Sequence, residues 1–229
     1  MPKYAGWETP SESMRLLNEN YHDHHSEKIE IFKGFAAKLS PDMYEYFVRH
    51  PAVKYVESDE YVQIDDKFEE TEKLAAEISK DDKNSNLGKN SEKEVETSSV
   101  VYKTKSSLNL SRLINRDPIT DINKSYYKFG YESAYDVYVY VIDTGVNVNH
   151  SSFIDRLGYD TENKNRVTLG KNFLESEGID DKNGHGTHVA GIVGSTTWGV
   201  AKRVNIVSVK VMNQNGSGKW SDILAAIEW

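Results

Sequence analysis

Two runs of β-branched residues, with one glycine-rich helical segment between them, constrain the fold of this chain more than any other feature. The runs are Val137–Ile142 (VYVYVI) and Val204–Met212 (VNIVSVKVM), and both are apolar enough to be strands buried on both faces. Residues His185–Gly194 have the apolar spacing of a helix. Because strand, helix and strand in this order are typical of a parallel crossover, we predict an α/β domain with a parallel sheet.

An earlier zone of the chain predicts a small domain of mixed helix and strand. Lys28–Phe32 and Val53–Glu57 alternate apolar and polar residues, as half-buried strands do. Between them, Ser40 is a natural N-cap for a helix over Asp42–Arg49, because its hydroxyl can accept a hydrogen bond from a free backbone N–H. We therefore expect a small α+β domain over residues 1–64.

The segment that follows is acidic and poor in apolar residues. Residues 65–99 carry 11 Asp and Glu against 6 Lys, which is most of the net charge of −8. Such a segment cannot bury enough apolar surface to offset the conformational entropy lost on folding. We interpret residues 65–105 as a flexible linker and residues 106–229 as a second globular unit.

The charge and the apolar runs exclude two classes of function. With 28 Lys and Arg against 36 Asp and Glu, and no basic stripe, the sequence lacks the clustered cations that a nucleic-acid surface needs. Its longest apolar run, Val137–Ile142, is far shorter than the roughly 20 residues of a membrane-spanning helix. The absence of Cys is compatible with a reducing or an oxidising compartment.

Asp143 and His185 are the candidate chemical groups. Asp143 directly follows the first strand, and the carboxyl ends of parallel strands face the ligand crevice of an open α/β sheet. His185 begins the helix with a glycine on each side, which leaves its imidazole accessible from solvent. Two simpler interpretations remain open: an Asp that makes an Asx turn before Gly145, and a metal ion bound by His185 and His188. The second lacks both the Glu of an H-E-x-x-H motif and a third ligand, so we expect no metal site.

A carboxylate at a strand end and an imidazole 42 residues later match the orienting and general-base members of a nucleophilic triad. The carboxylate would accept the Nδ1–H of the imidazole, so that Nε2 can take a proton from a serine hydroxyl. The sequence around both residues resembles the subtilisin family of serine proteases, in particular its fungal branch similar to proteinase K. The resemblance is carried by Tyr140–Val146 (YVIDTGV), Asn183–Gly191 (NGHGTHVAG), Gly194-Ser195, Gly199–Lys202, Val209–Val211, Asn215–Gly218 and Leu110–Ile114.

The resemblance implies roles for several residues. Asp143 would be the triad Asp and His185 the triad His, whereas His188 would hold a structural position. Residues 216–218 would form the edge strand that pairs with the substrate backbone, and a Met and a Trp would flank the substrate subsites. For the Met and the Trp, ordinary places in the core and on the surface remain the alternative. The substrate-binding residues are thus Gly216, Ser217, Gly218, Met212 and Trp220.

The first zone resembles the inhibitor-type propeptide of the same proteases over Phe32–Leu39 and His50–Asp59. The resemblance implies a ferredoxin-like module that assists folding and blocks the active-site cleft. The chain would then carry its own intramolecular inhibitor in residues 1–64. The first strand of that module is not recognisable in Met1–Asn20. Removal of the propeptide by the protease itself is expected within Ser98–Lys105.

Two parts of the family pattern have no counterpart in this sequence: the nucleophilic Ser, in a block similar to Gly-Thr-Ser-Met, and the oxyanion-hole Asn. Residues Ser221–Trp229 predict a helix with Ser221 as its N-cap and with no stop signal, so we expect the chain to end inside a helix. We therefore expect residues 106–229 to be the N-terminal part of a subtilisin-like catalytic domain, inactive on its own.

The function implied by the resemblance is that of a serine endopeptidase acting on polypeptides. A second interpretation is a truncated, inactive relative that acts at most as a propeptide-type protease inhibitor, because inhibition needs only a folded module and a tail that enters a cleft. A remote third is an aspartic protease, since Asp143-Thr144-Gly145 is the motif of that class. Only one such motif is present, and that mechanism has no role for His185.

The expected chemistry needs no cofactor. Structural calcium is common in the family, but no complete set of oxygen ligands can be assigned in the sequence. The resemblance implies a secreted or vacuolar protein, although Met1–Asn20 lacks the apolar stretch of a signal peptide. N-x-[ST] sequons, which matter only in the secretory pathway, occur at Asn109, Asn123, Asn149 and Asn215.

Overall fold

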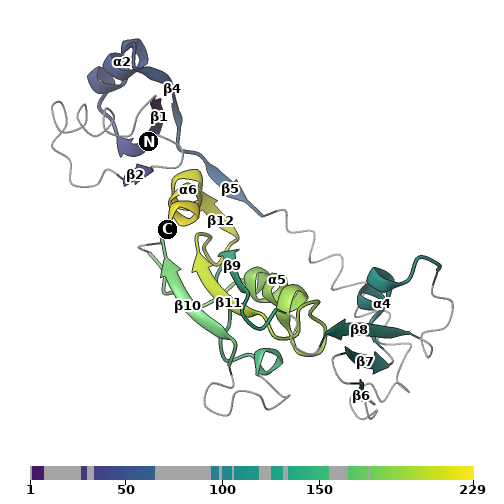
Figure 1. Cartoon of the computed structure of the whole chain (residues 1–229). Coiled ribbons are helices and arrows are strands. Elements are labelled where there is room, and N and C mark those ends of the chain that lie inside the picture. Colours follow the sequence, from purple (N-terminus) through teal and green to yellow (C-terminus); the bar gives the residue numbers. More distant parts are fainter. Residues whose placement is uncertain are drawn as a thin grey trace.

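The computed structural model describes residues 2–7, 27–29, 34–64, 94–97, 100–104, 106–118, 125–130, 134–154, 165–174 and 176–229. These residues form an N-terminal antiparallel sheet with one helix, a second antiparallel sheet, and a parallel sheet with a helix on each face (Figure 1). No helix within these ranges combines the length and the apolar character that crossing a bilayer requires.

The N-terminal sheet has the strand order β2-β3-β1-β4, and each pair of adjacent strands is antiparallel. Helix α2 packs on it through Phe47, whose ring meets that of Phe35 edge-on at 5.5 Å between centroids. Ser40 caps α2 as predicted, since its side chain accepts a hydrogen bond from the Met43 N–H. The elements are β1 (Pro2–Trp7), β2 (Glu27–Ile29), β3 (Gly34–Lys38), α2 (Pro41–Arg49) and β4 (Val53–Ser58).

Strand β1 corrects the sequence prediction, which places no strand in Met1–Asn20. The strand lies between β3 and β4, with Tyr4 opposite Ala36 on one side and Glu57 on the other. The residues of β1 show no sustained alternation of apolar and polar types. Its stability therefore comes from two neighbouring strands that are distant in sequence, which a local pattern does not reveal.

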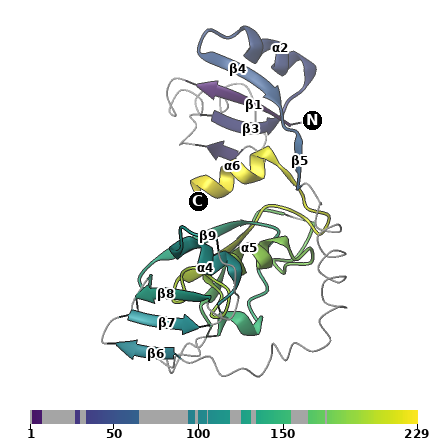
Figure 2. The ribbon, with the colours of Figure 1, turned by 90° about the vertical axis from the view of Figure 1, so that its right-hand side faces the viewer.

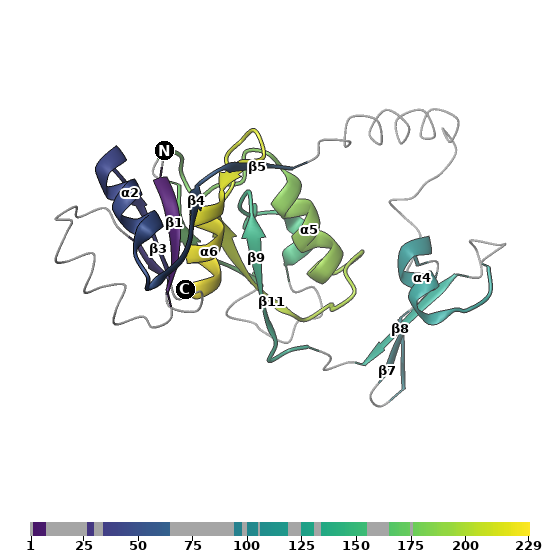
Figure 3. The same cartoon turned by 90° about the horizontal axis from the view of Figure 1, so that it is seen from above.

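The parallel sheet has the order β10-β11-β9, with both pairs parallel, as the sequence predicts. Helix α5 covers one face, where Ala190 packs with Val141, Val204 and Ile206. Helix α6 covers the other face, where Ala226 packs with Val207, Val209 and Val211 (Figure 3). The elements are β9 (Tyr138–Asp143), β10 (Val167–Asn172), α5 (His185–Gly194), β11 (Asn205–Lys210) and α6 (Trp220–Glu228), with a short 3-10 helix, η2 (Ser151–Phe153), before β10.

A second antiparallel sheet, β6-β7-β8, joins β6 (Glu94–Thr97) and β7 (Val100–Thr104) to β8 (Tyr126–Gly130). Helix α4 (Leu108–Ile114) packs on it through Leu110, which contacts Tyr127 and Phe129. The sequence predicts residues 65–105 as a linker without structure, and for β6 and β7 this is wrong. Their partner β8 lies beyond that segment, so the acidic composition alone conceals the pairing. Residues 65–93 lie outside the described residues, as do Ser98, Ser99 and Lys105 of the predicted cleavage segment.

The N-terminal unit is joined to the parallel-sheet unit by a two-stranded ribbon of β5 (Tyr61–Gln63) and β12 (Ser217–Lys219), which pair antiparallel (Figure 2). The Ile64 N–H donates to the Gly216 carbonyl at 2.8 Å, and the Trp220 N–H donates to the Glu60 carbonyl at 3.2 Å. Helix α6 lies between the N-terminal sheet and the parallel sheet in Figures 1 and 2. A strand from the first unit thus extends an edge of the second.

The start of α6 corrects the prediction that Ser221 is an N-cap. The N-cap is Lys219, whose side chain makes no capping hydrogen bond. Instead the carboxylate of Asp59, 162 residues earlier, accepts hydrogen bonds from the Ser221 N–H at 2.9 Å and the Ser221 hydroxyl at 2.8 Å. Both side chains are buried. An anion at a helix N-terminus is favourable, so α6 is capped by the N-terminal unit.

Replacing Asp59 with Ala is expected to loosen the β5–β12 ribbon. The change removes the side-chain cap of α6, which is worth about 1 to 2 kcal/mol, a factor of roughly 5 to 30 in an opening equilibrium. Amide hydrogen exchange at Ile64 and Trp220 should accelerate by that factor. Glu60→Ala, at the exposed neighbouring position, is the control. Equal exchange rates in the two variants would show that Asp59 does not hold the ribbon.

Candidate active site

Asp143 and His185 meet at the carboxyl end of the parallel sheet. Asp143 is the last residue of β9 and is buried, and His185 is the first residue of α5. The His185 Nδ1 lies 2.8 Å and 2.9 Å from the two carboxylate oxygens of Asp143. Since an ionised carboxylate only accepts hydrogen bonds, Nδ1 carries the proton and Nε2 is left as an acceptor. The pair predicted from the sequence is therefore in contact.

Two backbone features let the pair approach. Gly184, just before His185, has φ of +100° and forms the N-cap of α5 in a left-handed conformation. Gly186 lies against the end of β9, where an added Cβ would be 2.1 Å from the Gly145 carbonyl oxygen and 3.1 Å from the Asp143 Cβ. The glycines on both sides of His185 thus serve backbone conformation and close packing.

Gly186→Ala is expected to destabilise the protein, whereas Gly191→Ala in the same helix is expected to stabilise it. At Gly186 the methyl group would overlap backbone that cannot move away cheaply, at a cost of about 2 to 3 kcal/mol. At Gly191 an added Cβ meets nothing within 4 Å. There the higher helix propensity of Ala should add about 0.5 to 1 kcal/mol. Urea denaturation checks both values, and midpoints shifted in the same direction would contradict the packing argument.

Asp181 is a second carboxylate beside this pair, and the sequence does not single it out. Burial raises the pKa of its carboxyl, but hydrogen bonds from Thr187, Gly184 and Thr144 outweigh burial and hold the pKa below the usual 3.8. The carboxylate therefore stabilises the fold at neutral pH. This stabilisation is lost as the pH falls below about 3.8 and through the lower pKa of the folded state.

The predicted substrate-binding residues lie on or beside the ribbon strand β12. Ser217 and Gly218 are in β12 and pair with Gln63 and Val62 of β5, while the Gly216 carbonyl accepts the Ile64 N–H. Met212 packs against the cluster of β11 and α6, and Trp220 begins α6 with 49% of its surface exposed. Residues 216–218 thus lie against an extended peptide segment, strand β5 and Ile64. Among the described interactions, neither Met212 nor Trp220 contacts a side chain of that segment.

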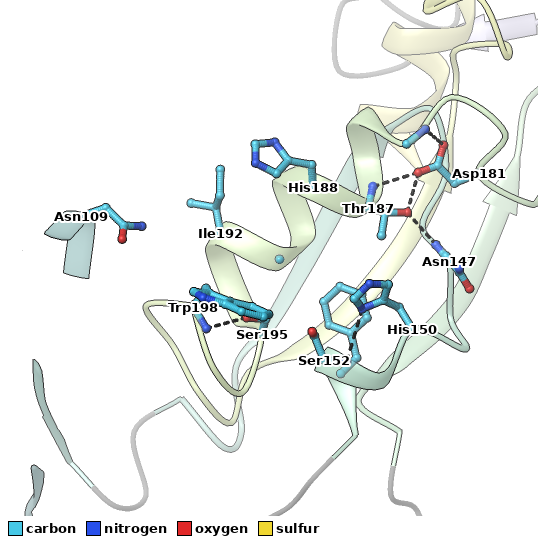
Figure 4. A pocket seen from close by; sticks show the side chains of 13 residues that line it. Asn109, Asn147, His150, Ser152, Asp181, Thr187, His188, Ile192, Ser195 and Trp198 are labelled. Carbon is cyan, nitrogen blue, oxygen red and sulfur yellow. Dashed lines mark hydrogen bonds between the residues drawn. The ribbon is translucent and has the colours of Figure 1, made fainter. Parts of the chain in front are cut away.

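A cavity of about 610 Å³ lies beside α5 (Figure 4). Phe153, Ile192 and Trp198 give it an apolar part, while His150, His188 and Asp181 are among its polar residues. Asp143 and His185 do not line it, so His188 faces a different space from the pair. Within the described part of the chain, no three His, Cys, Asp or Glu side chains gather closely enough to hold a metal ion.

Comparison with known proteins shows two matched segments. Residues 135–229 match the family described as the subtilase family, and residues 8–65 match the family described as peptidase inhibitor I9. The chain is 45% identical over 114 residues to Subtilase-type proteinase RRT12 of Saccharomyces cerevisiae. The matched region covers 48% of this chain and 21% of that protein. It is 33% identical over 199 residues to Proteinase R of Parengyodontium album, and this match covers 87% of this chain and 38% of that protein.

A solved structure, that of a cold adapted subtilisin-like serine proteinase, matches with 37% identity and a TM-score of 0.44 over 55% of this chain and 41% of that chain. The chain spans between 21% and 38% of the length of the two curated relatives named above. The inhibitor segment precedes the subtilase segment, in the order that the motifs predict. The chain is therefore similar to subtilisin-like serine proteases over residues 135–229 and to their inhibitor-type segment over residues 8–65.

Proposed function

We propose that this chain supplies the Asp and His of a serine endopeptidase active site. Asp143 would hold the imidazole as its Nδ1–H tautomer, and His185 Nε2 would take the proton of a serine hydroxyl as that oxygen attacks a peptide carbonyl. His185 would then return the proton to the leaving amine. The observation that carries the proposal is the contact of Nδ1 with both Asp143 oxygens, at 2.8 Å and 2.9 Å. The reaction requires no cofactor.

Polypeptides are the proposed substrates, bound along β12. The pairing of β5 with β12 supports this, because an extended segment already hydrogen-bonds to residues 216–218 through its main chain. Main-chain pairing gives affinity with little demand on sequence. Met212 and Trp220 are proposed to flank the subsites on either side of this strand.

The test joins residues 1–229 to the part of Proteinase R that lies beyond its match with this chain, and measures hydrolysis of a peptide amide. The fusion protein should hydrolyse the peptide, and its His185→Ala variant should not. Circular dichroism checks that both proteins fold. Hydrolysis that survives His185→Ala in a folded protein would contradict the proposal.

Inhibition of proteases is a second candidate function, favoured by the β5–β12 pairing. The pairing places the end of the N-terminal unit on the strand proposed to bind substrate. We assign the inhibitor to residues 1–64 and the subtilase part to residues 106–229, with strands β6 and β7 in the segment between them. Titrating the 229-residue chain against intact Proteinase R tests inhibition in trans. If the rate of peptide hydrolysis by Proteinase R is unchanged at every ratio of the chain to the protease, the inhibitor segment does not act on other protease molecules.

Residence in the secretory pathway or the vacuole is proposed from the family and the sequons. Three of the sequon asparagines, Asn109, Asn149 and Asn215, are described and exposed. Expression in yeast, followed by treatment with an enzyme that removes N-glycans, should increase electrophoretic mobility. An unchanged mobility would contradict this location.

A further inference from the structure

Asp181 lies where the two elements that carry Asp143 and His185 meet, and the proposed reaction does not use it. Its Oδ1 accepts a hydrogen bond from the Thr144 hydroxyl at 2.9 Å. The same oxygen accepts the Gly184 N–H at 2.8 Å and the Asn183 N–H at 3.1 Å. One carboxylate oxygen thus binds the residue after the β9 strand and the two residues before His185.

The other oxygen of Asp181 binds the first turn of α5. Oδ2 accepts the Thr187 N–H at 2.9 Å and the Thr187 hydroxyl at 2.5 Å (Figure 4). The Thr187 hydroxyl oxygen in turn accepts the Asn147 N–H at 2.9 Å, which ties the chain after β9 to the same helix turn. Hydrogen bonds to a charged group are shorter and stronger than neutral ones, so the carboxylate fixes all of these donors together.

Thr144 completes the connection to the pair. Its hydroxyl donates to Asp181 and accepts the Gly186 N–H at 3.0 Å, and its own N–H donates to Asp143 Oδ1 at 2.6 Å. Thr144 is fully buried. Asp181 and Thr144 therefore hold the backbone on both sides of His185. Thr144 also orients the Asp143 carboxylate through its own N–H.

We propose that Asp181 is a positioning residue that keeps His185 Nδ1 in contact with Asp143. It acts by holding the first turn of α5 against the end of β9. This inference rests on the proposed function for the roles of Asp143 and His185. The alternative is that Asp181 only stabilises the start of α5, as any capping carboxylate does.

Asp181→Asn in the 229-residue chain separates the two possibilities. Asn has one acceptor oxygen and an NH₂ group that would face N–H and O–H donors, so part of the network must break. The readout is the set of ring nitrogen chemical shifts of His185, measured by NMR above the titration range of histidine. These shifts report which nitrogen carries the proton. Asp180→Asn, at the exposed neighbouring position, is the matched control.

We expect the ratio of the Nδ1–H to the Nε2–H form to fall about tenfold in Asp181→Asn, because a hydrogen bond to a charged group is weakened. Asp180→Asn should keep the ratio of the unmodified chain. A lower urea midpoint in Asp181→Asn with an unchanged ratio would overturn the proposal, because a cap that only stabilises the helix affects folding and not the tautomer.

Thr144 gives a second test that does not depend on the folding of Asp181→Asn. Thr144→Val removes the hydroxyl with little change in shape and should lower the ratio, whereas Thr144→Ser keeps the hydroxyl and should preserve it. A preserved ratio in both overturns the positioning role. Asp143→Asn is the reference variant, because it removes the contact between the Asp143 carboxylate and His185. If Asp143→Asn changes the ratio while Asp181→Asn and Thr144→Val do not, only the positioning role fails. If Asp143→Asn leaves the ratio unchanged, the proposed function fails as well.

Discussion

Replacing Asp143 with Asn in the fusion protein is expected to lower kcat about 10⁴-fold, with a small change in KM. In the unmodified protein the carboxylate accepts the Nδ1–H of His185 at 2.8 Å, so that Nε2 is the ring nitrogen that would accept the serine proton. An Asn amide at the same place can donate its N–H to Nδ1. The proton of the imidazole then moves to Nε2, which can no longer act as a base.

Steady-state kinetics with a peptide amide measure this effect. The control is Asp136→Asn, because Asp136 is an exposed carboxylate in the turn before β9, with the same charge change and no contact with His185 among the described interactions. The control should retain the kcat of the fusion protein. A similar loss of kcat in both variants would mean that net charge, and not the orientation of the imidazole, limits the reaction.

The sequence predicts the elements that local patterns determine. The apolar runs predict β9 and β11 to within two residues, and the segment His185–Gly194 coincides with α5. The contact of Asp143 with His185 could also be expected, because a strand end and a helix start in a parallel crossover lie at the same edge of the sheet.

Features that depend on partners distant in sequence escape such patterns. Strand β1 is held by β3 and β4, and β7 by β8, and in each case the partner lies well outside the segment itself. The cap of α6 comes from Asp59, which no motif links to Ser221. Asp181 is one of two adjacent acidic residues in a polar loop, and only the geometry shows which of them binds Thr144.

Lys210 is the most consequential residue that the sequence does not reveal. It ends β11 opposite Asp143 and its side chain is fully buried. Its Nζ donates to the Thr144 carbonyl at 2.6 Å and to the Met212 carbonyl at 3.0 Å, and lies 3.5 Å from Glu177 Oε2. In the sequence Lys210 interrupts an apolar run, where a lysine is more often at the surface than inside. The buried ammonium group therefore lies between Thr144, which follows β9, and Met212, at the start of the loop that leads from β11 to β12.

Lys210→Met should lower the free energy of unfolding by about 3 to 5 kcal/mol, because it leaves the Thr144 and Met212 carbonyls without their donor and the half-buried Glu177 without its cation. Met fills a similar volume, so loss of packing contributes little. With an m-value of about 2 kcal/mol/M, the urea midpoint should fall by roughly 2 M. Lys182→Met, at an exposed lysine, should leave the free energy of unfolding within about 0.5 kcal/mol of that of the unmodified chain.

The double variant Lys210→Met with Glu177→Gln separates the ion pair from the two carbonyl contacts. Removing the Glu177 charge should restore part of the loss, since Gln leaves no unpaired anion while the Thr144 and Met212 carbonyls stay without their donor. If Lys210→Met shifts the midpoint no more than Lys182→Met does, the buried lysine does not hold this edge of the sheet. If the double variant is less stable than Lys210→Met alone, Glu177 acts through the Gln214 N–H, which it accepts at 3.1 Å, and not through Lys210.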